Sequence, residues 1–110
     1  MPSLGKAMFK GASGKTYRFR VFALGTRFRN RSGVYAVTSR ASKGSGGHQH
    51  VILYVGQTED FSQPFAKHRK AGAVQQRGAD CICVLSDESE ESRLAKEKDL
   101  VAAFHQVCND

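Results

Sequence analysis

The sequence predicts an α+β domain built from a small antiparallel β-sheet flanked by helices. Short segments rich in β-branched and aromatic residues recur through the first 85 positions, separated by turn-forming residues. A glycine-, serine- and lysine-rich stretch over residues 40–50 joins two of these segments as a long, mobile hairpin connection. The carboxyl-terminal part of the chain instead shows the helical period of apolar residues.

Length and composition exclude several classes of protein. The 110 residues provide one hydrophobic core, and 40% hydrophobic with 25% charged residues is typical of a globular chain. No apolar run approaches the roughly 20 residues of a membrane-spanning helix, and three early lysines interrupt any export signal. Three cysteines without an export signal indicate reduced thiols and a cytoplasmic protein that does not associate with membranes.

The chain is predicted to divide into a flexible N-terminal arm, residues 1–16, and a single domain, residues 17–110. The arm is small, polar and rich in glycine. Residues 14–16 read Gly-Lys-Thr, as at the end of a phosphate-binding loop, but Phe9 stands where that motif needs another glycine. A flexible arm is therefore the better interpretation.

An alternating pattern predicts the first strand of the domain. Tyr17, Phe19 and Val21 fall on one face of an extended chain, while Arg18 and Arg20 fall on the other. This is the pattern of a half-exposed strand. Runs of β-branched and aromatic residues predict three more strands, over residues 34–39, 51–55 and 79–85.

Two helices are predicted to follow the hairpin. The first covers residues 60–72, with Pro64 in the first turn, where proline is tolerated. The second covers residues 88–105, and Asp87 with Glu90 resembles a capping box at its start.

Glu97 stands out within the second predicted helix. At about 100° per residue, it falls on the apolar stripe formed by Leu94, Val101 and Phe104. An unpaired carboxylate is costly to bury, so Glu97 is expected to face a cation, a metal ion or several donors. The alternative is a structural ion pair at the edge of the stripe.

Charge is distributed unevenly along the chain. The 17 basic and 10 acidic residues give a net charge of +7, but residues 1–77 carry +12 and residues 78–110 carry −5. In the basic part, Arg27, Arg29 and Arg31 are interleaved with an aromatic residue. Such a charge distribution attracts polyanions such as nucleic acids. A solubilising surface is the alternative.

Two groups of residues could act as metal ligands. Cys81 and Cys83 point to one face of a strand, and with Cys108 they could bind zinc, although a two-residue spacer is usual in such sites. Buried reduced thiols are favoured. His48 and His50 lie in the glycine-rich connection, where solvated histidines are favoured over a metal site.

Several motifs occur in an order that resembles the GIY-YIG nuclease family. Gly33-Val34-Tyr35 comes first, followed by Tyr54-Val55-Gly56-Gln57-Thr58, then by Glu97 on a late helix, and finally by Cys108-Asn109. The match covers about residues 31–110 and makes the strand from Tyr17 an N-terminal addition. The resemblance implies that the two tripeptides lie on neighbouring strands of a small antiparallel sheet.

The resemblance also implies a role for each matching residue. Tyr35 would hydrogen-bond or deprotonate the attacking water, and Tyr54 would help to hold the water and phosphate in line. Glu97 would be the single protein carboxylate on a divalent ion, usually magnesium, with manganese as a substitute. His68 matches a histidine often found on the first helix. Structural support would come from Gly33, Gly56 and Asn109.

The sequence departs from the family pattern at its arginine position, which is occupied by Pro64. An arginine there would supply a bidentate cation to the phosphate, which proline cannot do. Lys67 and His68 follow three and four positions after Pro64, on the helical face of that position, and Lys67 is the candidate replacement. Contacts to the nucleic acid backbone are expected from Arg27, Arg29, Arg31, Arg69 and Lys70.

The resemblance therefore implies a metal-dependent endonuclease that hydrolyses phosphodiester bonds in DNA. Two alternatives remain open. The first is a nucleic-acid-binding module of the same fold with a degenerate site. The second is a protein-interaction factor whose basic face meets an acidic protein.

Overall fold

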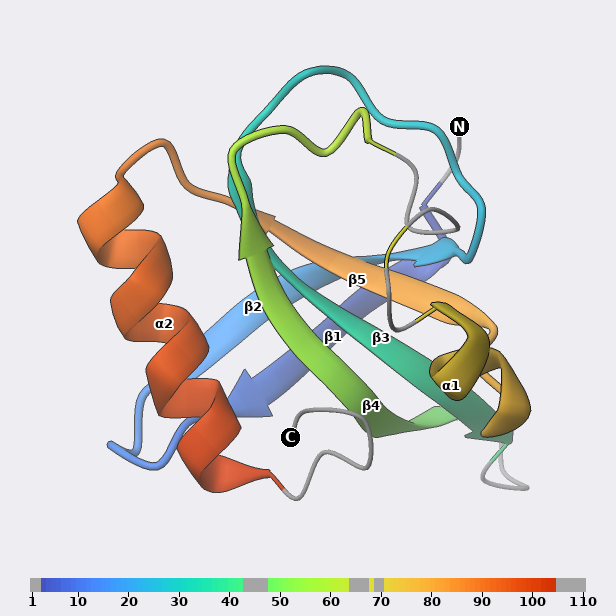
Figure 1. The fold of residues 1–110 in the computed structure, drawn as a ribbon. Coiled ribbons are helices and arrows are strands. Elements are labelled where there is room, and N and C mark those ends of the chain that lie inside the picture. The colour runs from blue at the N-terminus through green and yellow to red at the C-terminus, as the bar shows by residue number, and fades with distance from the viewer. Residues whose placement is uncertain (1–2, 43–47, 64–67, 69–70, 105–110) are drawn as a thin grey trace.

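A computed structural model describes residues 3–42, 48–63, 68 and 71–104 of the chain. These residues form five strands and two helices (Figure 1). Their bounds in chain order are β1 Gly5–Lys10, β2 Thr16–Ala23, β3 Gly33–Ser42, β4 His48–Thr58, α1 Ala71–Gln76, β5 Cys81–Ser86 and α2 Glu90–Ala103.

The five strands form one antiparallel sheet in the order β1-β2-β5-β3-β4. Figure 1 shows that the sheet is strongly curled, with β1 and β2 behind β3 and β4 and with α2 along one side. The predicted α+β class with an antiparallel sheet is confirmed. The last strand of the sheet to be synthesised, β5, lies at its centre.

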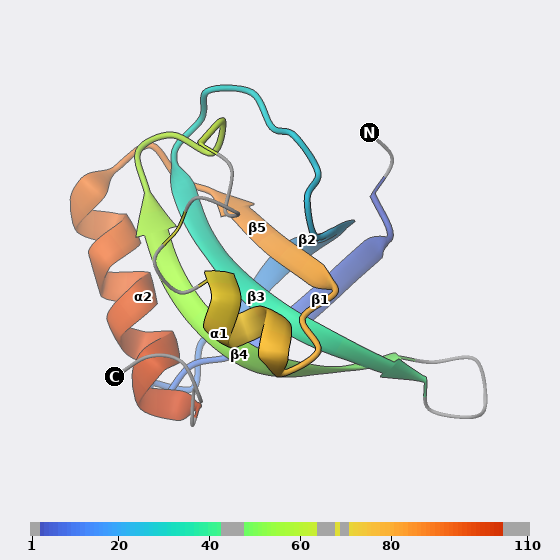
Figure 2. The same cartoon turned by 45° about the vertical axis from the view of Figure 1, so that its right-hand side comes forward.

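The face of the sheet that contacts α2 holds the larger core. Phe19, Val34 and Val55 are completely buried there, together with Leu100 from α2. The other face holds a second core, to which α1, in front of the sheet in Figure 2, contributes the buried Val74. Since both faces are covered around β3 and β5, these central strands are apolar on both sides.

A β-bulge determines which way β4 presents its side chains. The pairing register shifts between Val37 and Thr38, whose partners are Tyr54 and Ile52. Leu53 is the extra residue. The shift lets Ile52 enter the core beneath α2 while Tyr54 projects from the opposite face.

The prediction of a flexible arm over residues 1–16 is wrong for its described part, because β1 pairs with β2 along its whole length. Phe9 and Ala7 are buried in the core beneath α2. The turn between β1 and β2 also contacts α2, since Ser13 donates its N–H to one Asp99 carboxylate oxygen at 2.8 Å. The hydroxyls of Ser13 and Tyr17 both donate to the other oxygen at 2.7 Å. The loop that resembles part of a phosphate-binding motif thus binds a carboxylate of its own chain.

The predicted connections and the first predicted helix also need correction. β3 extends to Ser42 and β4 begins at His48. The hairpin connection is therefore confined to residues 43–47, which lie outside the described residues. Residues 60–63 form a turn and a bend, and the helix α1 begins only at Ala71. Asp60 stabilises that turn by accepting from the N–H and hydroxyl of Ser62.

The second predicted helix exists, but its cap and its buried face differ from the prediction. Ser89, not Asp87, is the N-cap and accepts from the N–H of Ser92. Leu94 and Val101 are 46% and 38% exposed, whereas Leu100 is fully buried. The face of α2 that is buried therefore differs from the predicted apolar stripe.

Cys81 and Cys83 lie in the core beneath α2 as free, buried thiols. Burial raises the pKa of Cys81 to about 11 and that of Cys83 to about 12. Both thiols therefore remain protonated at neutral pH, which disfavours metal binding by thiolate. Cys108 and the side chain of His48 lie outside the described residues. His50 Nδ1 lies 2.8 Å from the Thr38 hydroxyl and its ring contacts Phe9.

Neither helix of the described chain combines the length and the apolar character required to span a membrane.

Candidate functional site

Tyr35 and Tyr54 lie side by side on neighbouring strands. Tyr35 is paired with Gly56 and Val37 with Tyr54, so both tyrosines project from the same face of the sheet. Their ring centroids are 6.0 Å apart and their planes are inclined by 36°. Tyr35 is buried and Tyr54 is half-buried. The two motifs that suggested these tyrosines are thus adjacent in space.

Two glycines allow this packing. A Cβ atom on Gly56 would lie 2.6 Å from the hydroxyl oxygen of Tyr35. A Cβ atom on Gly33 would overlap the carbonyl oxygen of Leu85 and lie 2.7 Å from the ring of Phe61. Both positions therefore exclude any side chain, which gives a steric reason for the supporting role predicted for Gly33 and Gly56.

The Tyr35 hydroxyl is held in its protonated form. Burial raises the pKa of Tyr35 well above its usual value, and a hydrogen bond to Tyr54 and the charge of Glu97 raise it further. At neutral pH Tyr35 is therefore a neutral phenol. Such a group can orient a water molecule by hydrogen bonding.

His68 extends the tyrosine pair. Its Nε2 atom lies 3.4 Å from the hydroxyl oxygen of Tyr54, and the two ring centroids are 5.1 Å apart. Either atom can be the donor, because the neutral imidazole has two tautomers. The structure therefore brings three of the predicted site residues together: Tyr35, Tyr54 and His68.

Glu97 approaches this group from the other side of the sheet edge. Leu100 of α2 packs on the face opposite the tyrosines. One turn earlier, Glu97 lies beside β4, where burial raises the pKa of its carboxyl and a hydrogen bond from the backbone N–H of Gln57 opposes that rise. The negative charge of Glu97 contributes to the raised pKa of Tyr35, whose hydroxyl lies over Gly56. Glu97 therefore acts electrostatically on Tyr35 from the α2 side of the sheet.

The Glu97 carboxylate is suited to a hard divalent cation. Burial raises its pKa above the usual range despite the amide of Gln57, and no cation of the described chain pairs with it. Among the described residues no three or more His, Cys, Asp or Glu side chains group closely enough to hold a metal ion. A cation at Glu97 would therefore take its remaining ligands from water and substrate oxygens.

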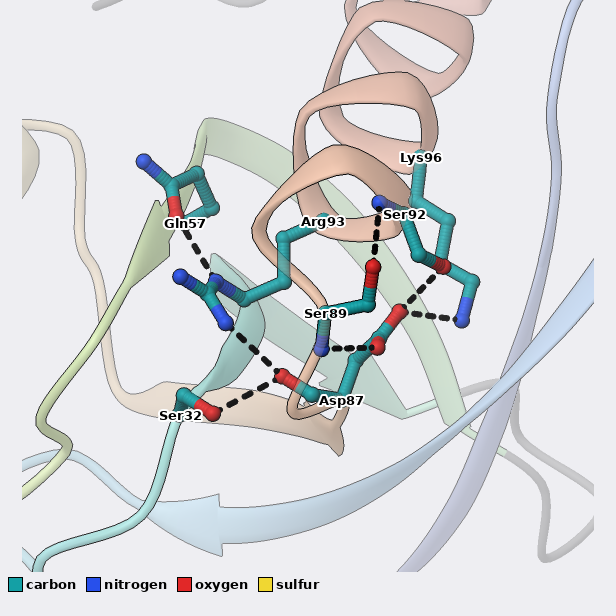
Figure 3. Close-up of polar contacts among 7 residues, drawn as sticks. All are labelled: Ser32, Gln57, Asp87, Ser89, Ser92, Arg93 and Lys96. Carbon is teal, nitrogen blue, oxygen red and sulfur yellow. Dashed lines mark hydrogen bonds and ion pairs between the residues drawn. The ribbon is translucent and has the colours of Figure 1, made fainter.

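A buried arginine fixes α2 to β4. Arg93 is only 3% exposed, and its Nε donates to the Gln57 side-chain oxygen at 3.0 Å (Figure 3). Its Nη1 donates to the backbone oxygen of Asp87 at 3.2 Å, an oxygen that Ser32 also contacts. Gln57 thus contacts Arg93 through its side chain and faces Glu97 through its backbone.

Asp87 organises the start of α2 around this arginine. Its carboxylate accepts from the Ser89 N–H at 3.0 Å, from the Ser92 hydroxyl at 2.5 Å and from Lys96 Nζ at 2.7 Å (Figure 3). These donors lower the pKa of Asp87 to about 2, with Lys96 contributing most. Asp87 therefore fixes the helix start from outside the capping position predicted for it.

A cavity of about 830 Å³ opens beside Tyr35 and His68. Its walls are the β2–β3 connection, residues 24–28, the last residue of β4, Thr58, and the segment that follows, residues 60–63. Arg27 is the only lysine or arginine among the described residues that line it. Of the predicted nucleic-acid contacts that the structure describes, Arg27 is thus the one that shares a cavity with Tyr35.

Arg29 and Arg31 line a separate hollow of about 440 Å³. Glu59, Asp87 and Glu88 line the same hollow, so acidic groups accompany these two arginines. The remaining predicted positions fall outside the described residues: Pro64, Lys67, Arg69, Lys70 and Asn109.

Sequence reasoning missed Gln57 and Arg93 as site residues. A signal was present for Arg93, since it precedes Glu97 by four positions and therefore shares its side of the helix. An arginine on the buried side of a helix needs polar partners, which directs attention to the strand it faces. Gln57 belongs to the second motif of the resemblance, but the motif predicted no role for its side chain.

Comparisons with models of known protein families, with curated proteins and with solved structures find no match for this chain.

Proposed function

We propose that this protein is a metal-dependent endonuclease that hydrolyses phosphodiester bonds in DNA. The observation that carries the proposal is the pairing of Tyr35 and Tyr54 over Gly56, with the charge of Glu97 acting on Tyr35 from the α2 side of β4. Two phenol hydroxyls and one carboxylate are suited to hold a water, a phosphate and a cation. The order of these residues in the sequence, which resembles the GIY-YIG family, adds independent support.

Each group has a chemical task in this proposal. Tyr35 holds the attacking water by a hydrogen bond, since its raised pKa keeps the phenol protonated. Tyr54, with His68 behind it, donates to a phosphate oxygen. Glu97 would hold a magnesium or manganese ion, and such an ion would supply positive charge to the phosphate and to the leaving oxygen. Arg27 supplies positive charge from the wall of the adjoining cavity.

The direct test compares cleavage of duplex DNA with magnesium or manganese by the wild type, Glu97→Gln and Tyr35→Phe. Loss of one charge-stabilising group typically lowers a hydrolytic rate by about 10²–10³-fold, which is the expectation for both variants. Glu91→Gln is the matched control, because Glu91 is an exposed carboxylate on the same helix. Manganese affinity, measured by calorimetry, should fall in Glu97→Gln only. Cleavage that survives Glu97→Gln would place the activity elsewhere.

A second candidate function is supported by Pro64, which stands at the family's arginine position. In this case the protein binds nucleic acid through the same surface but cuts it very slowly. Pro64→Arg should then raise the cleavage rate by about 10²-fold or more. If Lys67 or Arg27 already supplies the cation, the wild type cuts, Pro64→Arg adds little, and Lys67→Ala or Arg27→Gln removes most of the rate.

A further inference from the structure

One face of the β1–β2 hairpin is open and basic. Along β1, Lys6 and Lys10 alternate with the buried Ala7 and Phe9, and all the lysines of this strand are exposed. Along β2, Arg18 and Arg20 alternate with buried Phe19 and Val21 in the same way. In the register of the hairpin, Lys6 lies opposite Arg20 and Met8 opposite Arg18. We name the four cations Lys6, Lys10, Arg18 and Arg20 the hairpin face.

The hairpin face carries no compensating charge. The strands β1 and β2 contain no acidic residue, and the first one in the chain is Glu59. No side chain of the described residues forms an ion pair or a hydrogen bond with any of the four cations. Arg29 and Arg31 differ in this respect, since acidic residues share their hollow. The hairpin face is therefore more strongly attractive to a polyanion than those arginines are.

The strand register connects the hairpin face to the candidate site. Lys6 pairs with Arg20, Arg20 with Val84, Val84 with Tyr35, and Tyr35 with Gly56. Directly paired residues share a face of the sheet, so this row runs across all five strands on one face. At about 4.8 Å per strand, Arg20 lies roughly 10 Å and Lys6 roughly 14 Å from Tyr35 along the sheet.

We propose that the hairpin face binds the sugar–phosphate backbone of the nucleic acid next to the bond held at Tyr35. The inference rests on the proposed function, because it places the substrate's flanking segment on the same face as the tyrosines. Arg18 and Arg20 are about 7 Å apart along β2, and Lys6 and Lys10 are about 13 Å apart along β1, so the hairpin presents separate charges to a backbone. Such contacts position a nucleic acid without reading its sequence.

The composition of the hairpin face favours nucleic acid over an acidic protein. Stable protein interfaces have a core enriched in aromatic side chains and depleted in lysine. Beside the four cations lies one exposed apolar side chain, Met8 at 56% exposure. Tyr17 and Phe19 point to the opposite face, and Phe22, the aromatic ring of β2 on the same face, is half-buried against Phe28. Phosphate binding requires only the charges that are present.

The test measures how binding of a fluorescent DNA duplex depends on salt, in EDTA so that no cleavage occurs. Each lost phosphate contact should make the slope of log affinity against log salt shallower by about 0.9. Arg18→Gln and Arg20→Gln are each expected to show this change. Lys98→Gln removes one exposed charge from α2, on the other side of the sheet, and should leave the slope unchanged.

Cleavage with magnesium, measured on the same proteins, separates this inference from the proposed function. If the slopes change in Arg18→Gln and Arg20→Gln but the wild type does not cleave DNA, the result supports binding at the hairpin face and overturns the proposed nuclease activity. If the wild type cleaves DNA but the slopes of Arg18→Gln and Arg20→Gln equal that of Lys98→Gln, the result overturns only the inference about the hairpin face. A wild type that does not bind DNA overturns both and leaves an acidic protein as the partner of this surface.

Discussion

At the scale of single residues, the candidate site depends on the absence of side chains as much as on their chemistry. Tyr35 can lie over β4 only because position 56 is glycine, and Phe61 can cover β3 only because position 33 is glycine. The motif glycines could be named from the sequence. The neighbours that exclude a side chain could not, because Leu85 and Phe61 are far away along the chain.

Gly56→Ala should therefore damage both folding and function. Its Cβ would lie 2.6 Å from the Tyr35 hydroxyl oxygen, so the ring must move. Overpacking of this kind costs about 1–3 kcal/mol in the free energy of unfolding, and the displaced phenol should lower any cleavage rate. Urea unfolding and cleavage assays check the two effects. Gly72→Ala is the control: nothing lies within 4 Å of its Cβ, and alanine in a helix should stabilise by about 0.5–1 kcal/mol.

At the scale of the element, α2 shows what periodicity predicts and what it cannot. The helix was expected from its apolar spacing, and it exists over Glu90–Ala103. The buried face was predicted wrongly because Arg93, a long charged residue, occupies it while Leu94 is exposed. An arginine can cover a core with its aliphatic part when partners exist for its guanidinium. Those partners, Gln57 and the Asp87 backbone, are set by the fold.

Arg93→Met tests this arrangement. The variant keeps an apolar chain of similar length, but it removes the donor to the Gln57 side-chain oxygen and leaves the Asp87 backbone oxygen with Ser32 as its remaining donor. We expect a loss of about 1–3 kcal/mol in the free energy of unfolding. Because Gln57 also faces Glu97, manganese affinity should fall, as calorimetry can measure. Arg93→Lys restores the charge without the two-pronged geometry and should recover only part of either property. Unchanged manganese affinity in both variants would confine Arg93 to a structural role.

Asp87 gives α2 a dependence on pH. Its pKa of about 2 in the folded protein lies below the usual value near 3.9, so the folded state binds fewer protons. Its contribution is present above about pH 4 and is lost as pH falls through about 2. Asp87→Asn should be about 1 kcal/mol less stable than wild type at pH 7, and the difference should vanish near pH 2. Thermal unfolding across this range measures it, with Glu91→Gln as a control that shows no such convergence. If the difference in stability between Asp87→Asn and the wild type stays constant with pH, the lowered pKa of Asp87 is contradicted.

At the scale of the whole molecule, local patterns predicted the strands better than their connections. β2, β3, β4 and β5 were expected because β-branched and aromatic residues cluster in them. β1 was missed because its sequence is small, polar and basic, and only Ala7 and Phe9 enter the core. Its strand state comes from pairing with β2, which no local property of residues 5–10 reveals.

The candidate site divides in the same way. The tyrosines and Glu97 could be named from the sequence, since each carries a reactive group at a position that matches a motif of the family. The packing of the two tyrosines over Gly56 depends on the sheet order and on the bulge opposite Val37 and Thr38, which are properties of the complete fold.

The central position of β5 has a consequence for how the chain folds during synthesis. β2 is hydrogen-bonded to β1 and β5, and β3 is hydrogen-bonded to β4 and β5. Until residues 81–86 emerge, the nascent chain therefore consists of two separate hairpins, each of marginal stability alone. At a translation rate of about 5–20 residues per second, the interval between the end of β4 and the end of β5 lasts about 1–6 s. During that time the β2 and β3 edges that later face β5 are unpaired, so the nascent chain must avoid association with other chains until one short strand joins its two halves.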